Sequence, residues 1–253
     1  MNETIFRLED ITFAYPECEP VLKNFNLNIK NGECLSILGA NGCGKSTLLK
    51  ILAGLIFPTN GTFTAFNKQI DEKYLQKAAA VSYHRKVGFV FQDSEVQLFC
   101  STVYEELAFG PMQIGLSQQV VDQRIHELAR ILNIEKLLDK APFHLSGGEK
   151  KKVALGSTLI INPDVLLLDE PANTLDPRTQ AWLTHLLLNL TQSGKTIILA
   201  THDLNLAPAV SKRAILLNES HQIIEDMPTN QLLQRDTLLK KVNLVGENYQ
   251  PPM

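Results

Sequence analysis

A glycine-rich loop near residue 40 carries the clearest chemical signal in this chain. It reads Gly39-Ala40-Asn41-Gly42-Cys43-Gly44-Lys45-Ser46-Thr47 and fits the pattern G-x-x-x-x-G-K-[ST]. Glycines let the backbone wrap closely around phosphate oxygens, so that successive N–H groups point at the anion. Lys45 brings a full positive charge to the β- and γ-phosphates, and the Ser46 hydroxyl suits Mg²⁺. The loop therefore predicts a site that holds a nucleotide by its phosphates.

Two acidic residues follow a short apolar segment later in the chain. Residues 165–168 read Val-Leu-Leu-Leu, and Asp169 and Glu170 come directly after them. Ligands of α/β proteins bind beyond the carboxyl ends of the parallel strands. Asp169 therefore suits the coordination shell of the metal ion, and Glu170, which points elsewhere, suits a general base for the attacking water. The alternative is a strand end with two solvated acids, which the upstream loop disfavours.

The elements predicted around these residues place them in an α/β fold. Residues 34–38 form an apolar run before the loop, and residues 46–55 carry apolar side chains at helical spacing after it. Further strands are predicted at 5–8, 11–15, 25–29, 87–91, 165–168, 196–199 and 214–217, and a helix at 177–192. Alternating strands and helices predict a mostly parallel sheet. Helical apolar spacing predicts a helical subdomain inserted at about 95–160.

Length and composition narrow the remaining possibilities. The chain has 253 residues, of which 44% are hydrophobic, which is enough for one sizeable core. We expect a single domain over residues 1–238 and a short, loose tail over 239–253. A formal charge of −3 offers no basic surplus for nucleic acid. There is no run of 18 apolar residues and no signal-peptide pattern, so neither a membrane-spanning helix nor secretion is expected.

The cysteines indicate a reducing environment. They stand at positions 18, 34, 43 and 100, without a C-x-x-C pair or the histidine spacing of a zinc site. Cys43 lies inside the phosphate loop. There it is either a small filler residue or a thiol whose oxidation would block nucleotide binding.

Three further motifs follow in order along the chain. Residues 145–149 read Leu-Ser-Gly-Gly-Glu, residues 175–176 read Leu-Asp, and residues 201–203 read Thr-His-Asp. Together with the loop and the acidic pair, they resemble the ATP-binding-cassette (ABC) ATPases over about residues 5–235. The resemblance implies a P-loop NTPase (RecA-like) core with an N-terminal antiparallel β subdomain, and ATP and Mg²⁺ as ligands. It also implies that two such subunits hydrolyse ATP as a head-to-tail dimer.

In that family the Ser-Gly-Gly segment does not touch the ATP of its own subunit. By the resemblance, Ser146, Gly147 and Gly148 close on the γ-phosphate bound by the other subunit. The segment opens a helix predicted over residues 149–159, whose free N–H groups would form an anion site with no local anion. Glu149 stands where the family usually has Gln, so it can accept a hydrogen bond from the ribose hydroxyls but cannot donate one.

Four more residues acquire roles from the resemblance. Gln92 would sense Mg²⁺ and the attacking water, and His202 would reach the γ-phosphate. Tyr15 would stack on the adenine, and Asp176 would communicate across the dimer. For the first three, the structural alternatives are a polar strand cap, a structural histidine and an edge aromatic. Residues 172–174 depart from the usual spacer of the family, which bears on coupling between subunits rather than on hydrolysis.

The segment after Gln92 resembles one branch of the family. Residues 91–99 read Phe-Gln-Asp-Ser-Glu-Val-Gln-Leu-Phe, and residues 102–111 read Thr-Val-Tyr-Glu-Glu-Leu-Ala-Phe-Gly-Pro. They resemble the energy-coupling-factor (ECF) ATPases, in particular the cobalt and nickel branch. The resemblance implies a peripheral position on the cytoplasmic face of the membrane. It implies a second ATPase subunit (a copy or a paralogue), a transmembrane coupling subunit and a membrane substrate-binding subunit.

In the wider family this region receives the coupling helix of the membrane subunit. Its composition fits an apolar groove with acids beside it for basic partners. The expected lining is Leu98, Phe99, Val103, Tyr104 and Phe109, and the expected acids are Glu95, Glu105 and Glu106. Ordinary subdomain core is the alternative.

The transported substrate does not follow from this sequence, because the ATPase does not touch the cargo. ECF vitamin importers share the same segment, and other ABC importers are an alternative. A soluble ABC protein acting on ribosomes or DNA is disfavoured, since the chain has one cassette and no room for a long coiled coil before residue 145. A non-catalytic nucleotide sensor would lack Glu170 or His202, and both are present.

Overall fold

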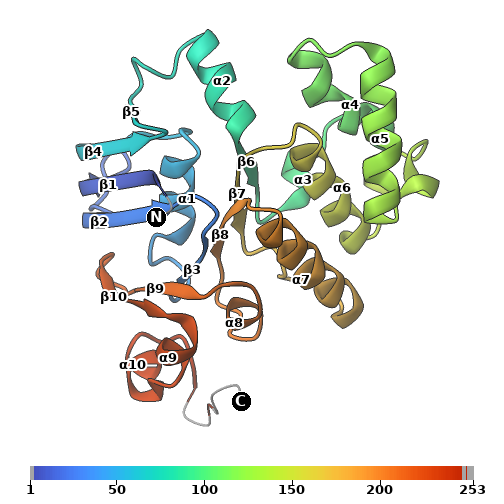
Figure 1. Cartoon of the computed structure of the whole chain (residues 1–253). Helices are drawn as coiled ribbons and strands as arrows, with labels where there is room; N and C mark the ends of the chain where they lie inside the picture. Colours follow the sequence, from blue (N-terminus) through green and yellow to red (C-terminus); the bar gives the residue numbers. More distant parts are fainter. Residues whose placement is uncertain (1–2, 247–248, 250–253) are drawn as a thin grey trace.

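A six-stranded sheet forms the centre of the molecule (Figure 1). The computed structural model describes residues 3–246 and 249. The strand order is β10-β9-β3-β8-β7-β6, and neighbours are parallel except β10, which is antiparallel to β9. The strands are β3 (Cys34–Leu38), β6 (Val87–Val90), β7 (Val165–Asp169), β8 (Thr196–Ala200), β9 (Arg213–Leu217) and β10 (Ile223–Pro228). The strands β3, β7 and β8 are buried along their whole length, as expected for parallel strands covered on both faces.

A second, antiparallel sheet lies beside this core (Figure 1). Its order is β2-β1-β4-β5, with bounds β1 (Thr4–Phe13), β2 (Leu22–Lys30), β4 (Asn60–Ala65) and β5 (Lys68–Gln69). The predicted antiparallel subdomain is confirmed, but the separate strands expected at 5–8 and 11–15 form one strand. The register with β2 shifts between Leu8 and Ile11, where Asp10 has φ 51°. This irregularity accounts for the polar break in the apolar pattern.

The helix α1 (Lys45–Leu52) follows the loop after β3 and packs into the main core. Gly44 precedes it with φ 107°, and a Cβ atom there would lie 2.5 Å from the carbonyl oxygen of Val21. Only glycine therefore lets the loop turn into the helix at this point. The other helices next to the core are α2 (Ala78–Lys86), α7 (Pro177–Gln192) and α8 (Leu206–Val210).

The predicted helical subdomain lies at the far end of the sheet from β9 and β10 (Figure 1). It comprises α3 (Ser94–Gln97), α4 (Val103–Gln113), α5 (Gln118–Leu132), α6 (Gly147–Leu159) and the short helices Glu135–Leu137 and Pro142–His144. These helices surround an apolar core of their own. The buried stripe of α5 runs through Val121, Ile125, Ala129 and Leu132, whereas Val120 and Ile131 on the same helix are exposed.

The C-terminal segment folds against β9 and β10. The helices α9 (Thr229–Leu233) and α10 (Asp236–Lys241) cover an apolar cluster that includes Leu239 and Val242. The tail expected from residue 239 onward is therefore packed at its start, because the boundary at 238 falls inside α10. Residues 247–248 and 250–253 of that tail lie outside the described residues. Within the described ranges, every helix is too short or too polar to cross a membrane.

Candidate nucleotide site

The phosphate loop is tightly packed around its own lysine. Lys45 is buried, and its Nζ donates hydrogen bonds to the carbonyl oxygens of Gly39 and Ala40 at 2.7 and 3.1 Å. A Cβ atom at Gly39 would lie 2.6 Å from Cys43 Sγ, so the residue must be glycine. Cys43 is buried, and burial raises the pKa of its thiol. Burial and a raised pKa both disfavour a reactive thiolate and support the filler interpretation.

The loop opens onto a cleft of about 390 Å³. Its lining is Tyr15, Val21, Asn41, Gly42, Gly44, Lys45, Ser46, Thr47, Gln92 and Glu170. Candidate residues from distant parts of the sequence therefore meet in one place. The hydroxyl of Tyr15 lies 3.4 Å from Thr47 Oγ1, and its ring meets Phe13 edge-on with 4.9 Å between ring centroids. These contacts hold the aromatic ring beside the loop.

Glu170 lies at the carboxyl end of β7, buried between the loop lysine and the segment after β8. Its Oε2 accepts hydrogen bonds from the N–H of His202 and the hydroxyl of Thr201, each at 3.3 Å, and lies 2.9 Å from His202 Nδ1. Its Oε1 lies 3.5 Å from Lys45 Nζ. Glu170 has φ 44°, a left-handed conformation that costs a non-glycine residue about 1–3 kcal/mol. Strain at a buried acid that faces a cleft is typical of a functional site.

The neighbouring Asp169 is suited to a metal ion. Burial raises the pKa of its carboxyl, while a hydrogen bond with Ser46 opposes that rise. Asp169 Oδ1 and Glu170 Oε1 are buried and, within the described part of the chain, have no hydrogen-bond partner. The partnerless oxygen of Asp169, on a carboxyl that is hydrogen-bonded to Ser46, fits Mg²⁺. No group of three acidic, histidine or cysteine ligands occurs among the described residues.

Replacing Asp169 with Asn is expected to stabilise the nucleotide-free protein. Because folding raises the pKa of Asp169, the folded state holds a proton that the unfolded chain releases, and stability falls as pH rises through the folded-state pKa. Asparagine carries no buried charge. The melting temperature should rise by about 2–6 °C at pH near 8, and the gain should shrink towards pH 4.

Thermal melts of the apo protein measure this effect. Asp164→Asn is the matched control, since Asp164 is exposed just before the other end of β7. A lower melting temperature for Asp169→Asn would contradict the expected cost of burying this charge.

His202 and Asp176 have contacts that clarify their structural roles. His202 is about half exposed (49%), and both its backbone N–H and its Nδ1 contact Oε2 of Glu170. Asp176 is the N-cap of α7 and accepts hydrogen bonds from the N–H groups of Arg178 and Thr179 and from the Thr179 hydroxyl. Asp176 thus has a local capping role, and its role across a dimer stays a prediction.

The Ser-Gly-Gly segment stands apart from the cleft. Ser146 is the N-cap of α6, which begins at Gly147, two residues earlier than predicted. Ser146, Gly147, Gly148 and Glu149 are absent from the cleft lining within the described residues. The sequence predicts free N–H groups at the start of this helix. The N–H of Ser146 is instead engaged, because it donates to the carboxylate of Glu149 at 2.8 Å.

Two residues outside the predicted set tie this helix to Gln92. Lys151 is buried, and its Nζ donates to the carbonyl oxygens of Phe91 and Gln92 at 3.3 and 2.9 Å. Gln97 accepts from the N–H of Phe91 at 3.3 Å and donates to the carbonyl oxygen of Ala154 at 2.9 Å. The contacts of Lys151 and the contact between Gln97 and Ala154 span about 60 residues of sequence, so no local pattern marks them.

The expected groove on the helical subdomain is only partly a surface. Phe99 and Phe109 are exposed and meet edge-on, with 5.0 Å between ring centroids. Val103 is fully buried, and Leu98 and Tyr104 pack against the subdomain core. Glu106 is also buried, and its Oε2 accepts from the N–H groups of residues 99 and 100 at 2.9 and 2.8 Å. Glu106 therefore caps the loop and is unavailable to a basic partner.

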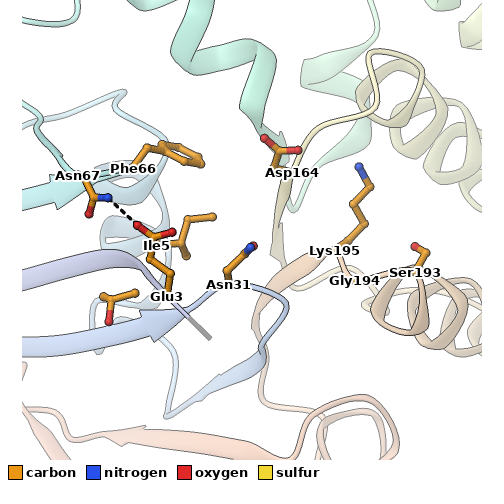
Figure 2. Close-up of a pocket in the computed structure, with 10 residues that line it drawn as sticks. Glu3, Ile5, Asn31, Phe66, Asn67, Asp164, Ser193, Gly194 and Lys195 are labelled. Carbon is orange, nitrogen blue, oxygen red and sulfur yellow. Dashed lines mark hydrogen bonds between the residues drawn. The ribbon is translucent and has the colours of Figure 1, made fainter. Parts of the chain in front are cut away.

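Another cavity, of about 490 Å³, lies at the end of the central sheet where β7 and β8 begin, opposite the nucleotide cleft (Figure 2). Asp164 and Lys195, which directly precede β7 and β8, face it together with Asn31 and Phe66. Ligands of parallel sheets bind at the carboxyl ends of the strands. The nucleotide cleft therefore remains the better candidate for catalysis, although it is the smaller of the two.

Comparison with known proteins places this geometry in a family. A family model described as ABC transporter matches residues 22–173. The nickel import ATP-binding protein LarO of Lactiplantibacillus plantarum is 42% identical over 91% of this chain and 96% of its own length.

Two solved structures have the same fold. The structure of cbiO1 from Clostridium perfringens, part of the ABC transporter complex cbiONQ, has a TM-score of 0.82 and 34% identity, over 96% of this chain and 95% of that one. A dimeric, post-hydrolysis structure of the ATP-binding cassette MJ0796 bound to ADP and Pi has a TM-score of 0.80 and 30% identity, over 89% and 99%. The chain therefore belongs to the ABC transporter family, as an ATPase whose hydrolysis of ATP powers transport.

Proposed function

We propose that this chain is the ATP-hydrolysing subunit of an ECF-type importer for a transition-metal ion, nickel or cobalt. The similarity to a nickel import protein and to a subunit of the cbiONQ complex supports this assignment. It acts on the cytoplasmic face of the membrane, with a second ATPase subunit, a coupling subunit and a substrate-binding subunit. The contact of Glu170 with both Lys45 and His202 carries the catalytic part of the proposal.

Within one subunit, the cleft binds ATP and prepares the attacking water. Tyr15 stacks on the adenine, and the loop N–H groups and Lys45 bind the phosphates. Lys45 leaves the carbonyl oxygens of Gly39 and Ala40 when it takes the phosphate. Glu170 accepts the proton of the attacking water, and His202 contacts the γ-phosphate.

Ser46, Gln92 and Asp169 hold the Mg²⁺ ion, which neutralises phosphate charge when bound. The partnerless Oδ1 of Asp169 supports this assignment. Across the dimer, Ser146, Gly147 and Gly148 bind the γ-phosphate held by the other subunit. Their position outside their own cleft supports that arrangement.

The exposed pair Phe99 and Phe109 forms the docking surface for the membrane subunit. Val96 and Met112 are exposed nearby on α3 and α4, at 74% and 54%. Glu95 and Glu105 are exposed on the same two helices. An apolar surface with acids beside it fits an amphipathic helix with basic residues.

Replacing Phe99 with Ser is expected to reduce co-purification of the membrane subunits severalfold while ATP hydrolysis by the isolated subunit stays unchanged. The physical reason is that an anchor of an apolar interface is lost without any change in the cleft. Ile131→Ser is the matched control, because Ile131 is equally exposed, at 63% against 66% for Phe99, but lies on α5. Equal losses for the two variants would contradict this docking surface.

The whole proposal is tested by purification from native membranes in mild detergent. Mass spectrometry of the tagged chain should find a polytopic coupling subunit and a small membrane substrate-binder. Uptake of labelled nickel and cobalt by cells with and without the complex should then identify the cargo. Recovery of ribosomes or DNA-repair proteins would overturn the transport role. Uptake of a vitamin instead of a metal ion would overturn only the cargo.

A further inference from the structure

Glu149 occupies the hydrogen-bonding groups of the signature serine. Its Oε2 accepts one hydrogen bond from the N–H of Ser146 and another from the Ser146 hydroxyl, each at 2.8 Å. Ser146 Oγ accepts in turn from the N–H of Glu149 at 3.4 Å. This is a capping box, in which two side chains satisfy backbone donors at the start of α6.

Both donors of Ser146 are therefore engaged by an anion of the same chain. A serine side chain has one proton to donate, and here the proton goes to a carboxylate. The hydrogen bonds from Ser146 hold the pKa of Glu149 below its usual range, so the group stays charged near neutral pH. Lys140 and Lys152 are the cations whose charges act on it.

A second capping box in the same subdomain differs in one contact. At α4, Glu105 accepts from the N–H of Thr102 at 3.1 Å, and Thr102 Oγ1 accepts from the N–H of Glu105 at 3.1 Å. Among the described residues, the Thr102 hydroxyl does not donate to Glu105. The cap itself needs only an acceptor at the third helical position, which glutamine supplies as well as glutamate. The charge of Glu149 is therefore not required by the helix.

We infer that Glu149 is a positioning residue that holds the Ser146 hydroxyl in the separated subunit and opposes its transfer to the γ-phosphate of the opposing ATP. The inference rests on the proposed role of Ser146 in the dimer. On closure, the γ-phosphate displaces the carboxylate from the hydroxyl proton, and two anions then lie beside one serine. Like charges so placed weaken association. Glu149 thus makes the closed dimer easier to reopen after each cycle.

The Glu149→Gln variant removes the negative charge of the side chain but keeps an acceptor oxygen for the helix cap. We would introduce it into the Glu170→Gln background, which keeps ATP intact, and measure the dissociation constant of the ATP-bound dimer by analytical ultracentrifugation. The dimer should tighten by about tenfold at low salt. The gain should shrink between about 50 and 500 mM salt, because salt screens exposed charges. Glu127→Gln removes an equal charge from an exposed site on α5 and should change nothing.

A second variant distinguishes charge from structure. Glu149→Ala removes both charge and cap, so it should also tighten the dimer while lowering the melting temperature. A purely structural role predicts an unchanged dimer for Glu149→Gln and a weaker one for Glu149→Ala, and that result would overturn the inference. If the parent protein forms no ATP-dependent dimer, the proposed dimeric function itself fails, and the role of Glu149 falls with it.

Discussion

Replacing Glu170 with Gln is expected to lower the turnover number for ATP hydrolysis by about 10²–10⁴-fold. The amide keeps the size of the side chain, and its oxygen can still accept from His202 and Thr201. It has no basic oxygen to take a proton from water. The carboxylate that faces Lys45 at 3.5 Å is also lost, so the lysine is freer to bind phosphate. ATP binding and the ATP-bound dimer should therefore persist. ATP titration measures the binding, and single-turnover hydrolysis measures the loss of the chemical step.

Asp203→Asn is the matched control for this variant. Asp203 adjoins His202, but its carboxylate accepts from the N–H groups of Asn205 and Leu206, at 2.8 and 3.2 Å, just before and at the start of α8. Asparagine caps helices nearly as well, so this variant should keep most of its turnover. Unchanged turnover in Glu170→Gln would show that another group accepts the proton.

Replacing Ser146 with Leu is expected to lower ATP hydrolysis by about 10²-fold or more. In the proposed dimer, the leucine removes a donor from the γ-phosphate and fills the space that the phosphate needs. ATP affinity of the separated subunit should stay the same, because Ser146 does not line the cleft of its own chain. Equilibrium binding to the monomer and steady-state hydrolysis measure the two effects separately.

Thr102→Leu provides the control for loss of a helix cap. Thr102 caps α4 through the same kind of capping box, so its loss should cost a similar amount, about 1 kcal/mol. Hydrolysis by the isolated protein should continue in this variant. Weaker ATP binding by monomeric Ser146→Leu would mean that the segment has been assigned to the wrong site.

The parts of the site that follow from the sequence are those set by contiguous motifs. The phosphate loop dictates its own geometry, since Gly39 and Gly44 stand where a side chain would collide with neighbouring atoms. The apolar run before Asp169 places the acidic pair at the carboxyl end of a buried strand, and the structure confirms that strand. The family resemblance predicts roles for Tyr15 and Gln92, and the structure brings both to the cleft.

The remaining features depend on contacts between distant segments. A lysine in a run of three, such as Lys151, normally indicates a solvated surface, yet Lys151 is buried against the backbone before α3. Glu106 looks like a surface acid until the N–H groups of residues 99 and 100 are found on it. Val103 belongs to the subdomain core because α4 packs against α5 and α6, which the pattern of α4 alone does not reveal.

The inward position of Lys45 bears on which anions the nucleotide cleft can bind. Its ammonium group donates hydrogen bonds to two carbonyl oxygens and lies 3.5 Å from the carboxylate of Glu170. A free phosphate or sulfate ion would have to break these contacts without an adenine to stack on Tyr15. ATP brings both the charge and the base, so it can compensate for the contacts that it disrupts. We therefore expect the cleft to favour ATP over inorganic phosphate or sulfate.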